Sequence, residues 1–331
     1  MNALVIKKNF LRWIASLLML GSGVIFCACN QQPDFVQATV TPSVAVSNSP
    51  VVQKTKTVPG DFLTQVILTP TPTAIPALTE SVMEEKIVPT TAQLKITIVY
   101  DNRIFDRRLK SAWGFSALVE YLDHWLLFDT GGDGSLLINN MDILGIDPTL
   151  IESLVLSHAH DDHTGGLSAL LASGSRPVIY LPPSFSNAFK QRVSNITEVI
   201  EVSPGLMIAQ NIFTTGELGG SIPEQALVID TDQGLMIITG CAHPGIVEMI
   251  EQSRLMFNDR VRLVMGGFHL GGKSESEIEE ILKDFRRLGV EQVAPCHCTG
   301  EEAIAAFATE YGEDFIQVGV GKQIILDPEN D

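Results

Sequence analysis

A short cluster of histidines constrains this chain more than any other feature of its sequence. Residues 157–166 read SHAHDDHTGG, and three of the seven histidines in 331 residues fall within six positions. The cluster follows the apolar run IESLVL, which predicts a buried strand that ends where the histidines begin. Three more apolar runs also end in histidine: LMIITGCAH, VRLVMGGFH and EQVAPCH. Because strand ends meet at one edge of a sheet, these side chains are expected to converge.

The spacing within the cluster predicts a site for two metal ions. At an extended strand end, His158 and His160 point to the same side and can bind one cation through imidazole nitrogens. Asp162 and His163 then face a neighbouring position, which suits a second cation that shares a bridging oxygen with the first. We expect zinc at both positions, with manganese or iron as alternatives. A chance histidine cluster on a solvated turn is the alternative interpretation, but it leaves the other three strand ends unexplained.

The N-terminus has the pattern of an export signal. Basic residues precede the apolar run WIASLLMLGSGVIF, which is too short to span a bilayer comfortably. We therefore expect residues 1–28 to be a signal peptide and the protein to be exported. Ala28 before Cys29 resembles the lipid-attachment site of bacterial lipoproteins, so Cys29 is expected to anchor the protein to the membrane, although Phe26 and Cys27 depart from that pattern. An uncleaved anchor helix is the alternative.

The composition then separates a stalk from a folded domain. Eight of the 17 prolines lie between Pro33 and Pro89, and residues 29–93 bury too little apolar area to fold, so they are expected to form a disordered Thr/Pro-rich stalk. Residues 94–331 alternate apolar strands with amphipathic helices and predict an α/β domain. Its clearest helix is SESEIEEILKDFRRLG, in which Ser274 and Glu277 form a capping box and Gly289 marks the end. The expected architecture is an αββα sandwich, two packed sheets flanked by helices.

The motifs together resemble a known family. SHAHDDHTGG resembles the H-x-H-x-D-H signature of the metallo-β-lactamase superfamily, and LLFDTGG resembles the aspartate motif upstream of it. Several other segments resemble the subgroup that includes the archaeal dihydropterin ribofuranosylaminobenzene phosphate synthases: WGFSALVEY, TTGEL, ITGCAHPGI, GGFHL and PCHCTG. The resemblance implies the metallo-β-lactamase fold over nearly the whole domain. It says less about substrate, because one fold carries many chemistries.

The resemblance also implies roles for individual residues. His158 and His160 would ligate the first metal, and Asp162, His163 and His297 the second. Asp129 would not bind a metal itself but would orient a metal ligand or its loop. Its alternative role is a cap or turn residue. The chain departs from the family pattern at TGC, so we assign Cys241 and His243 as further metal ligands. For Cys241 the alternative is simple packing, since a free cysteine packs like an apolar side chain.

The remaining residues define the expected chemistry. His269 is one histidine more than the usual ligand set needs, so it is expected to act as a general acid or to bind a substrate anion. Asp162 is expected to be a catalytic residue as well. The alternative for His269 is to donate a hydrogen bond to a metal ligand. Cys296 and Cys298 flank His297 and are expected to share the opposite face of an extended segment.

The expected function is that of an exported metal-dependent hydrolase, in which a metal-bound hydroxide attacks a carbonyl or phosphoryl centre of a small molecule. The net charge of −17 disfavours nucleic acid as a partner, and no protein partner can be inferred. Two alternatives remain open: a transferase like the dihydropterin synthases, and a non-catalytic zinc-binding module.

Overall fold

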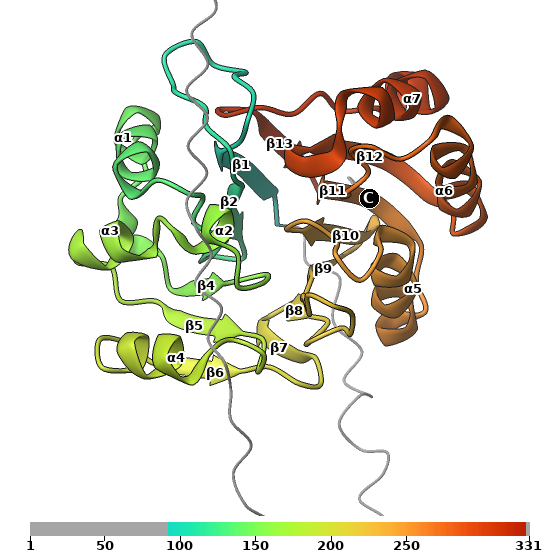
Figure 1. Cartoon of the computed structure of the whole chain (residues 1–331). Coiled ribbons are helices and arrows are strands. Elements are labelled where there is room, and N and C mark those ends of the chain that lie inside the picture. The colour runs from blue at the N-terminus through green and yellow to red at the C-terminus, as the bar shows by residue number, and fades with distance from the viewer. Residues whose placement is uncertain (1–91, 329–331) are drawn as a thin grey trace, which may run out of the picture. The chain divides into compact units, whose positions relative to one another are not determined.

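The computed structural model describes residues 92–328, so the expected signal peptide and nearly all of the expected stalk lie outside the described residues. The described residues form four layers, in the order helices, sheet, sheet, helices (Figure 1). The αββα sandwich expected from the sequence is confirmed. Within residues 92–328, no helix combines the length and the apolar character that crossing a bilayer requires.

The first sheet has seven strands and contains both the first and the last strand of residues 92–328. The strands are β1 (Leu94–Tyr100), β2 (Ser116–Tyr121), β3 (His124–Phe128), β4 (Ser153–Val155), β5 (Val178–Leu181), β6 (Val199–Glu201) and β13 (Gln323–Leu326). Their order across the sheet is β13-β1-β2-β3-β4-β5-β6. From β3 to β6 neighbouring strands are parallel, so the loops after β3 and β4 leave from the same edge.

The second sheet has six strands, and its parallel half carries the other histidine motifs. The strands are β7 (Leu206–Ala209), β8 (Ile212–Thr214), β9 (Leu227–Thr231), β10 (Gly234–Thr239), β11 (Val261–Gly267) and β12 (Val290–Cys296). They lie in the order β12-β11-β10-β9-β8-β7, and β10, β11 and β12 are parallel. The loops after these three strands therefore leave from one edge as well.

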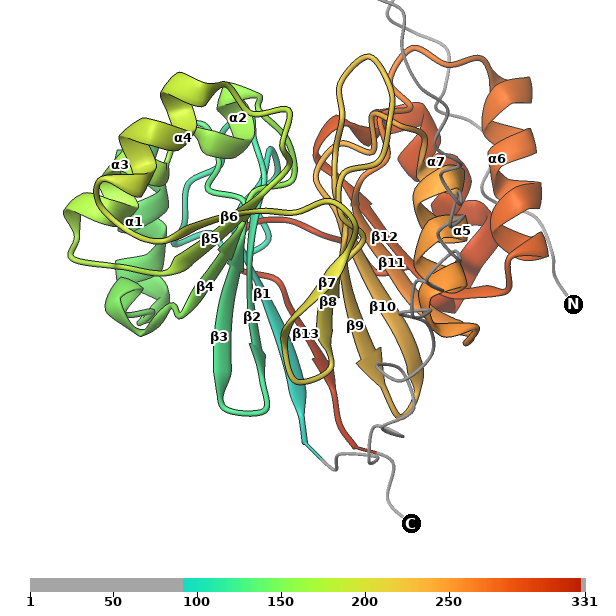
Figure 2. The same cartoon turned by 90° about the horizontal axis from the view of Figure 1, so that it is seen from below.

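The helices cover the outer faces of both sheets (Figure 2). They are α1 (Gly134–Leu144), α2 (Asp161–Thr164), α3 (Leu167–Ala172), α4 (Asn187–Ser194), α5 (Ile246–Phe257), α6 (Glu275–Arg287) and α7 (Glu301–Tyr311), with short 3-10 turns at Pro148–Leu150, His297–Thr299 and Gly312–Asp314. Helices α1, α3 and α4 share an apolar cluster with the first sheet, and α5, α6 and α7 share another with the second. A third cluster fills the space between the sheets.

Local sequence signals were accurate where the contacts are local. Helix α6 begins after Ser274, and the capping box between Ser274 and Glu277 is present in both directions, so that prediction is confirmed. His124, the histidine outside the four motifs, opens β3 as a half-buried strand residue. The run LMIAQNIFTTG, whose apolar residues favour a single strand, is instead the β7–β8 hairpin, because Asn211 adopts a left-handed backbone that turns the chain.

Candidate metal centre

The expected ligands come from loops at the carboxyl ends of strands in both sheets. The loop after β4 and the short helix α2 carry the first motif, and α2 lies in the half of the sandwich that contains α1 and α3 (Figure 1). The loops after β10, β11 and β12 carry the other three histidine motifs. One expectation was wrong in detail, because β4 ends at Val155 and neither histidine lies in the strand. His158 lies in a bend, and His160 is the N-cap residue of α2, with an extended backbone. The bend still brings their ring nitrogens together.

A first group of possible ligands consists of His158, His160, His243 and Cys241. His158 Nε2 lies 3.0 Å from His160 Nδ1, and the rings of His158 and His243 are 4.8 Å apart between centroids. One ligand atom each from His158, Cys241 and His243 falls within 4.8 Å of the others. His243 Nε2 is buried and forms no hydrogen bond within residues 92–328. A buried nitrogen without a partner is costly, and a bound cation would satisfy it.

A second group consists of Asp162, His163, His297 and Cys241, whose ligand atoms also lie within 4.8 Å of one another. His163 Nε2 is 3.2 Å from His297 Nε2 and 3.3 Å from Cys241 Sγ. Asp162 Oδ2 lies 3.3 Å from His297 Nε2. Ligand atoms around a tetrahedral zinc ion are separated by roughly 3.4–3.8 Å. The donor set and its spacing therefore fit a metal ion, and Cys241 belongs to both groups.

Asp129 determines which ring nitrogens are free in both groups. His163 Nδ1 donates to Asp129 Oδ2 at 2.6 Å. The Ser157 hydroxyl donates to the same oxygen at 2.7 Å and lies 2.9 Å from His158 Nδ1, from which it can accept. Both imidazoles then carry their proton on Nδ1 and keep the Nε2 lone pair for a metal, the arrangement common behind metal-binding histidines. Asp129 is not the cap of α1, a role that Asp133 fills.

Burial lowers the pKa of two histidines of the first group. Burial lowers the pKa of His158, and the surrounding histidines lower it further. Burial and then His269 lower the pKa of His243 to about 4. His163 differs: burial lowers its pKa, but the carboxylates of Asp129, Asp162 and Glu224 together more than offset this, so the net shift is upward. Burial raises the pKa of Asp162, yet hydrogen bonding to His297 holds it well below its usual value. Neutral imidazoles and an ionised carboxylate are the forms that bind metals.

Glu224 organises the loop that carries Cys241 and His243, and its importance was not expected from the sequence. It is fully buried. Its Oε1 accepts from the backbone N–H groups of Gly240, Cys241 and Ala242 at 2.9–3.0 Å, and its Oε2 accepts from His243 N–H at 2.9 Å. In the sequence Glu224 stands only as an acidic residue two positions before the apolar run ALVI, which does not indicate this role.

His297 is held by two residues at the end of β1 that also went unnoticed in the sequence. Its Nδ1 lies 3.2 Å from Asn102 Oδ1, and its carbonyl accepts from Asn102 Nδ2 at 2.9 Å. Its backbone N–H donates to Asp101 Oδ2 at 3.2 Å. His297 has a left-handed backbone, with φ of 48°. These contacts hold a conformation that costs energy for a residue with a Cβ, and they leave Nε2 directed at Asp162.

Cys296 and Cys298 do not share a face as expected, because the chain turns into a 3-10 helix at His297. Cys296 is buried in the core between the sheets. Cys298 lies beside Cys241, with its Sγ 3.7 Å from the Cys241 carbonyl oxygen. His269 is exposed, and its ring centroid is 4.4 Å from that of His243. Cys241, Cys296 and Cys298 are all free thiols.

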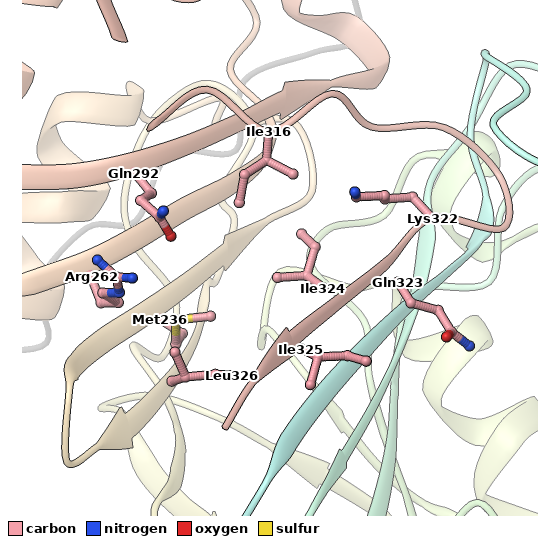
Figure 3. Close-up of a pocket in the computed structure, with 9 residues that line it drawn as sticks. All are labelled: Met236, Arg262, Gln292, Ile316, Lys322, Gln323, Ile324, Ile325 and Leu326. Atoms are coloured by element: carbon pink, nitrogen blue, oxygen red, sulfur yellow. The ribbon is translucent and has the colours of Figure 1, made fainter. Parts of the chain in front are cut away.

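A separate pocket lies between β13 and strands β10–β12 (Figure 3). Its volume is about 290 Å³, and it is lined by Met236, Arg262, Gln292, Ile316, Lys322, Gln323, Ile324, Ile325 and Leu326. None of these residues is a histidine, cysteine or carboxylate, so this pocket lacks strong metal ligands.

Comparison with known proteins places the chain in a family. The profile of the metallo-β-lactamase superfamily matches residues 114–249. A relative from Methanocaldococcus jannaschii, 7,8-dihydropterin-6-methyl-4-(β-D-ribofuranosyl)-aminobenzene-5'-phosphate synthase, is 30% identical over 278 residues, which cover 69% of this chain and 95% of the relative. The chain belongs to the metallo-β-lactamase superfamily. The resemblance to the synthase subgroup is thereby confirmed.

Solved structures of the metallo-β-lactamase superfamily agree with this assignment. The chain is 31% identical to Tm1679, described as a metal-dependent hydrolase of the β-lactamase superfamily, with a TM-score of 0.60 over 70% of this chain and 98% of that one. YhfI from Bacillus subtilis, a metallo-β-lactamase fold protein, aligns with a TM-score of 0.54 at 16% identity, covering 70% of this chain and 99% of that one. The second likeness concerns the fold alone.

Proposed function

We propose that the protein is a metal-dependent hydrolase that holds two zinc ions in the two ligand groups described above. The observation that carries the proposal is the position of Cys241, whose thiol belongs to both groups at once. A shared ligand holds two cations close together, as a binuclear hydrolytic site requires. The likeness to Tm1679, a metal-dependent hydrolase, supports the same reaction class. Manganese and iron are the alternative ions.

The chain's own residues supply binding, orientation and proton transfer. When bound, a pair of divalent ions activates water and stabilises negative charge on a substrate carbonyl or phosphoryl group. Asp162 is half-buried, ionised and next to His297, so it is placed to orient the attacking water as well as to hold a cation. His269 stands exposed beside His243, where it can donate a proton to a leaving group.

Hydrolysis is tested on the full-length protein with phosphoester, lactam and thioester substrates, with and without a chelator. Asp162→Asn is expected to lower kcat/KM by at least about 100-fold, because it removes a ligand and a water-orienting carboxylate. Asp161→Asn is the matched control, since Asp161 is the exposed neighbour at the start of α2. Chelator-sensitive turnover that Asp162→Asn abolishes supports the proposal. A protein that binds zinc but turns over none of these substrates supports a non-catalytic zinc module.

A transferase is the second candidate, and one observation favours it. The relative from Methanocaldococcus jannaschii, which this chain matches over 95% of the relative's length, is named as a 7,8-dihydropterin-6-methyl-4-(β-D-ribofuranosyl)-aminobenzene-5'-phosphate synthase. Incubation with a dihydropterin and a ribosyl-phosphate donor, followed by mass spectrometry, tests this function. Formation of the coupled product, without hydrolysis of the other substrates, would replace the hydrolase proposal.

The N-terminal residues bear on where this activity takes place. We propose that the protein is exported and held at a membrane through Cys29, because the leader and the small residue before Cys29 match that route. The stalk that follows would hold the domain away from the membrane surface. A small-molecule substrate fits this location better than nucleic acid, because the acidic chain would repel phosphate backbones.

A further inference from the structure

A third cluster of possible ligands lies beside the two groups, and two of its three residues belong to neither of them. It consists of Cys241, His269 and Cys298, whose ligand atoms fall within 4.8 Å of one another. These residues follow β10, β11 and β12, three neighbouring parallel strands. Cys241 is the one member that also belongs to the other groups. The cluster therefore extends the centre from Cys241 to the loops that follow β11 and β12.

The donor set of this cluster is softer than that of the other two. Two thiols and one imidazole select zinc and other soft ions over magnesium or calcium. A Cys₂His set with an open fourth position is a known arrangement around zinc. Ligand atoms of tetrahedral zinc lie roughly 3.4–3.8 Å apart, so the largest separation in this cluster must shrink by only about 1 Å. Exposed His269 can make that adjustment by a side-chain rotation.

The backbone around the cluster holds both outer ligands in place. A Cβ on Gly267 would lie 2.7 Å from Cys298 Sγ and 2.4 Å from the Gly240 carbonyl oxygen, so only glycine leaves room for this sulfur. His269 has a left-handed backbone, with φ of 51°, which is uncommon for a residue with a Cβ and often marks a functional site. Cys296, two residues from Cys298, is excluded because it lies in the core between the sheets.

We propose that Cys241, His269 and Cys298 form a third metal position, which binds zinc or another soft divalent ion. It fills after the other two, since it shares the Cys241 sulfur with them. One consequence rests on the proposed hydrolase function: a third ion engages His269 and prevents it from donating a proton. Excess zinc is therefore expected to inhibit turnover.

The metal count of the full-length protein tests the position without any assay of activity. Wild-type protein titrated with zinc is expected to bind three equivalents, the third more weakly. Cys298→Ala and His269→Ala should each bind two, whereas the matched control Cys296→Ala should still bind three. In cobalt-loaded protein, Cys298→Ala should weaken the sulfur-to-cobalt charge-transfer absorption at the third equivalent and leave it intact for the first two.

The outcomes separate this inference from the proposed function. Wild-type protein that saturates at two equivalents, or a third equivalent that survives both Cys298→Ala and His269→Ala, overturns the third position whether or not the protein is a hydrolase. If Cys298→Ala disturbs folding, His269→Ala decides, because the exposed side chain of His269 can be removed without opening the core. Loss of hydrolysis with a zinc count of three would instead contradict the proposed function alone.

Discussion

The contacts of Glu224 lead to a prediction about both stability and metal binding. In Glu224→Gln, the amide oxygen can still accept from Gly240, Cys241 and Ala242, but the amide N–H₂ must face the His243 N–H. One buried N–H then loses its acceptor, at a cost of about 1–3 kcal/mol. The three remaining bonds change from charge-assisted to neutral and lose about 1 kcal/mol each.

Part of this loss is offset, because burial raises the pKa of Glu224, and the neutral amide no longer has a charge to desolvate. The free energy of unfolding is therefore expected to fall by about 2–4 kcal/mol, and Tm by about 4–16 °C for a domain of this size. The loop that moves carries two expected ligands, Cys241 and His243, so zinc affinity should fall by about 10- to 100-fold.

Thermal unfolding followed by circular dichroism measures the first effect, and zinc titration against a chromophoric competitor measures the second. Glu313→Gln serves as the control, because Glu313 is an exposed carboxylate far from the ligand loops in sequence. Equal Tm and equal zinc affinity for Glu224→Gln and wild-type protein would show that the carboxylate does not organise the loop. A lower Tm with unchanged zinc affinity would reduce Glu224 to a purely structural residue.

Four further predictions follow from the centre and the termini. Cys241→Ala should lower zinc occupancy, Cys241→Asp should recover it, and Cys296→Ala should leave the first two zinc equivalents unchanged; equal binding by Cys241→Ala would return Cys241 to a packing role. Asp129→Asn should lower zinc affinity about 10- to 100-fold, because the ring protons lose the acceptor that places them; unchanged affinity would contradict this. Limited proteolysis should leave a resistant core that begins near Leu94, and a resistant fragment that keeps residues 30–90 would refute the boundary. Cys29→Ala should shift the protein from the membrane fraction to the soluble fraction, and continued membrane association would indicate an anchor helix instead.

The sequence alone determined the fold family and predicted most residues of the candidate site. Metal ligands need particular side chains at short spacings, so His158, His160, Asp162 and His163 are visible within one six-residue window. The capping box of α6 was equally clear, because a cap and its partner lie three residues apart. Features that depend on neighbours along the chain leave a local pattern, and a reader of the sequence can recognise it.

The tertiary structure alone decided how these ligands combine. The contact between Cys241 and His163 joins residues 78 positions apart, and that between Asn102 and His297 joins residues 195 apart. No local pattern encodes such pairs, because they arise only when two sheets pack face to face and the ends of their strands meet. The same holds for buried Glu224, whose role depends on backbone N–H groups, which every residue but proline carries and which no sequence pattern reveals.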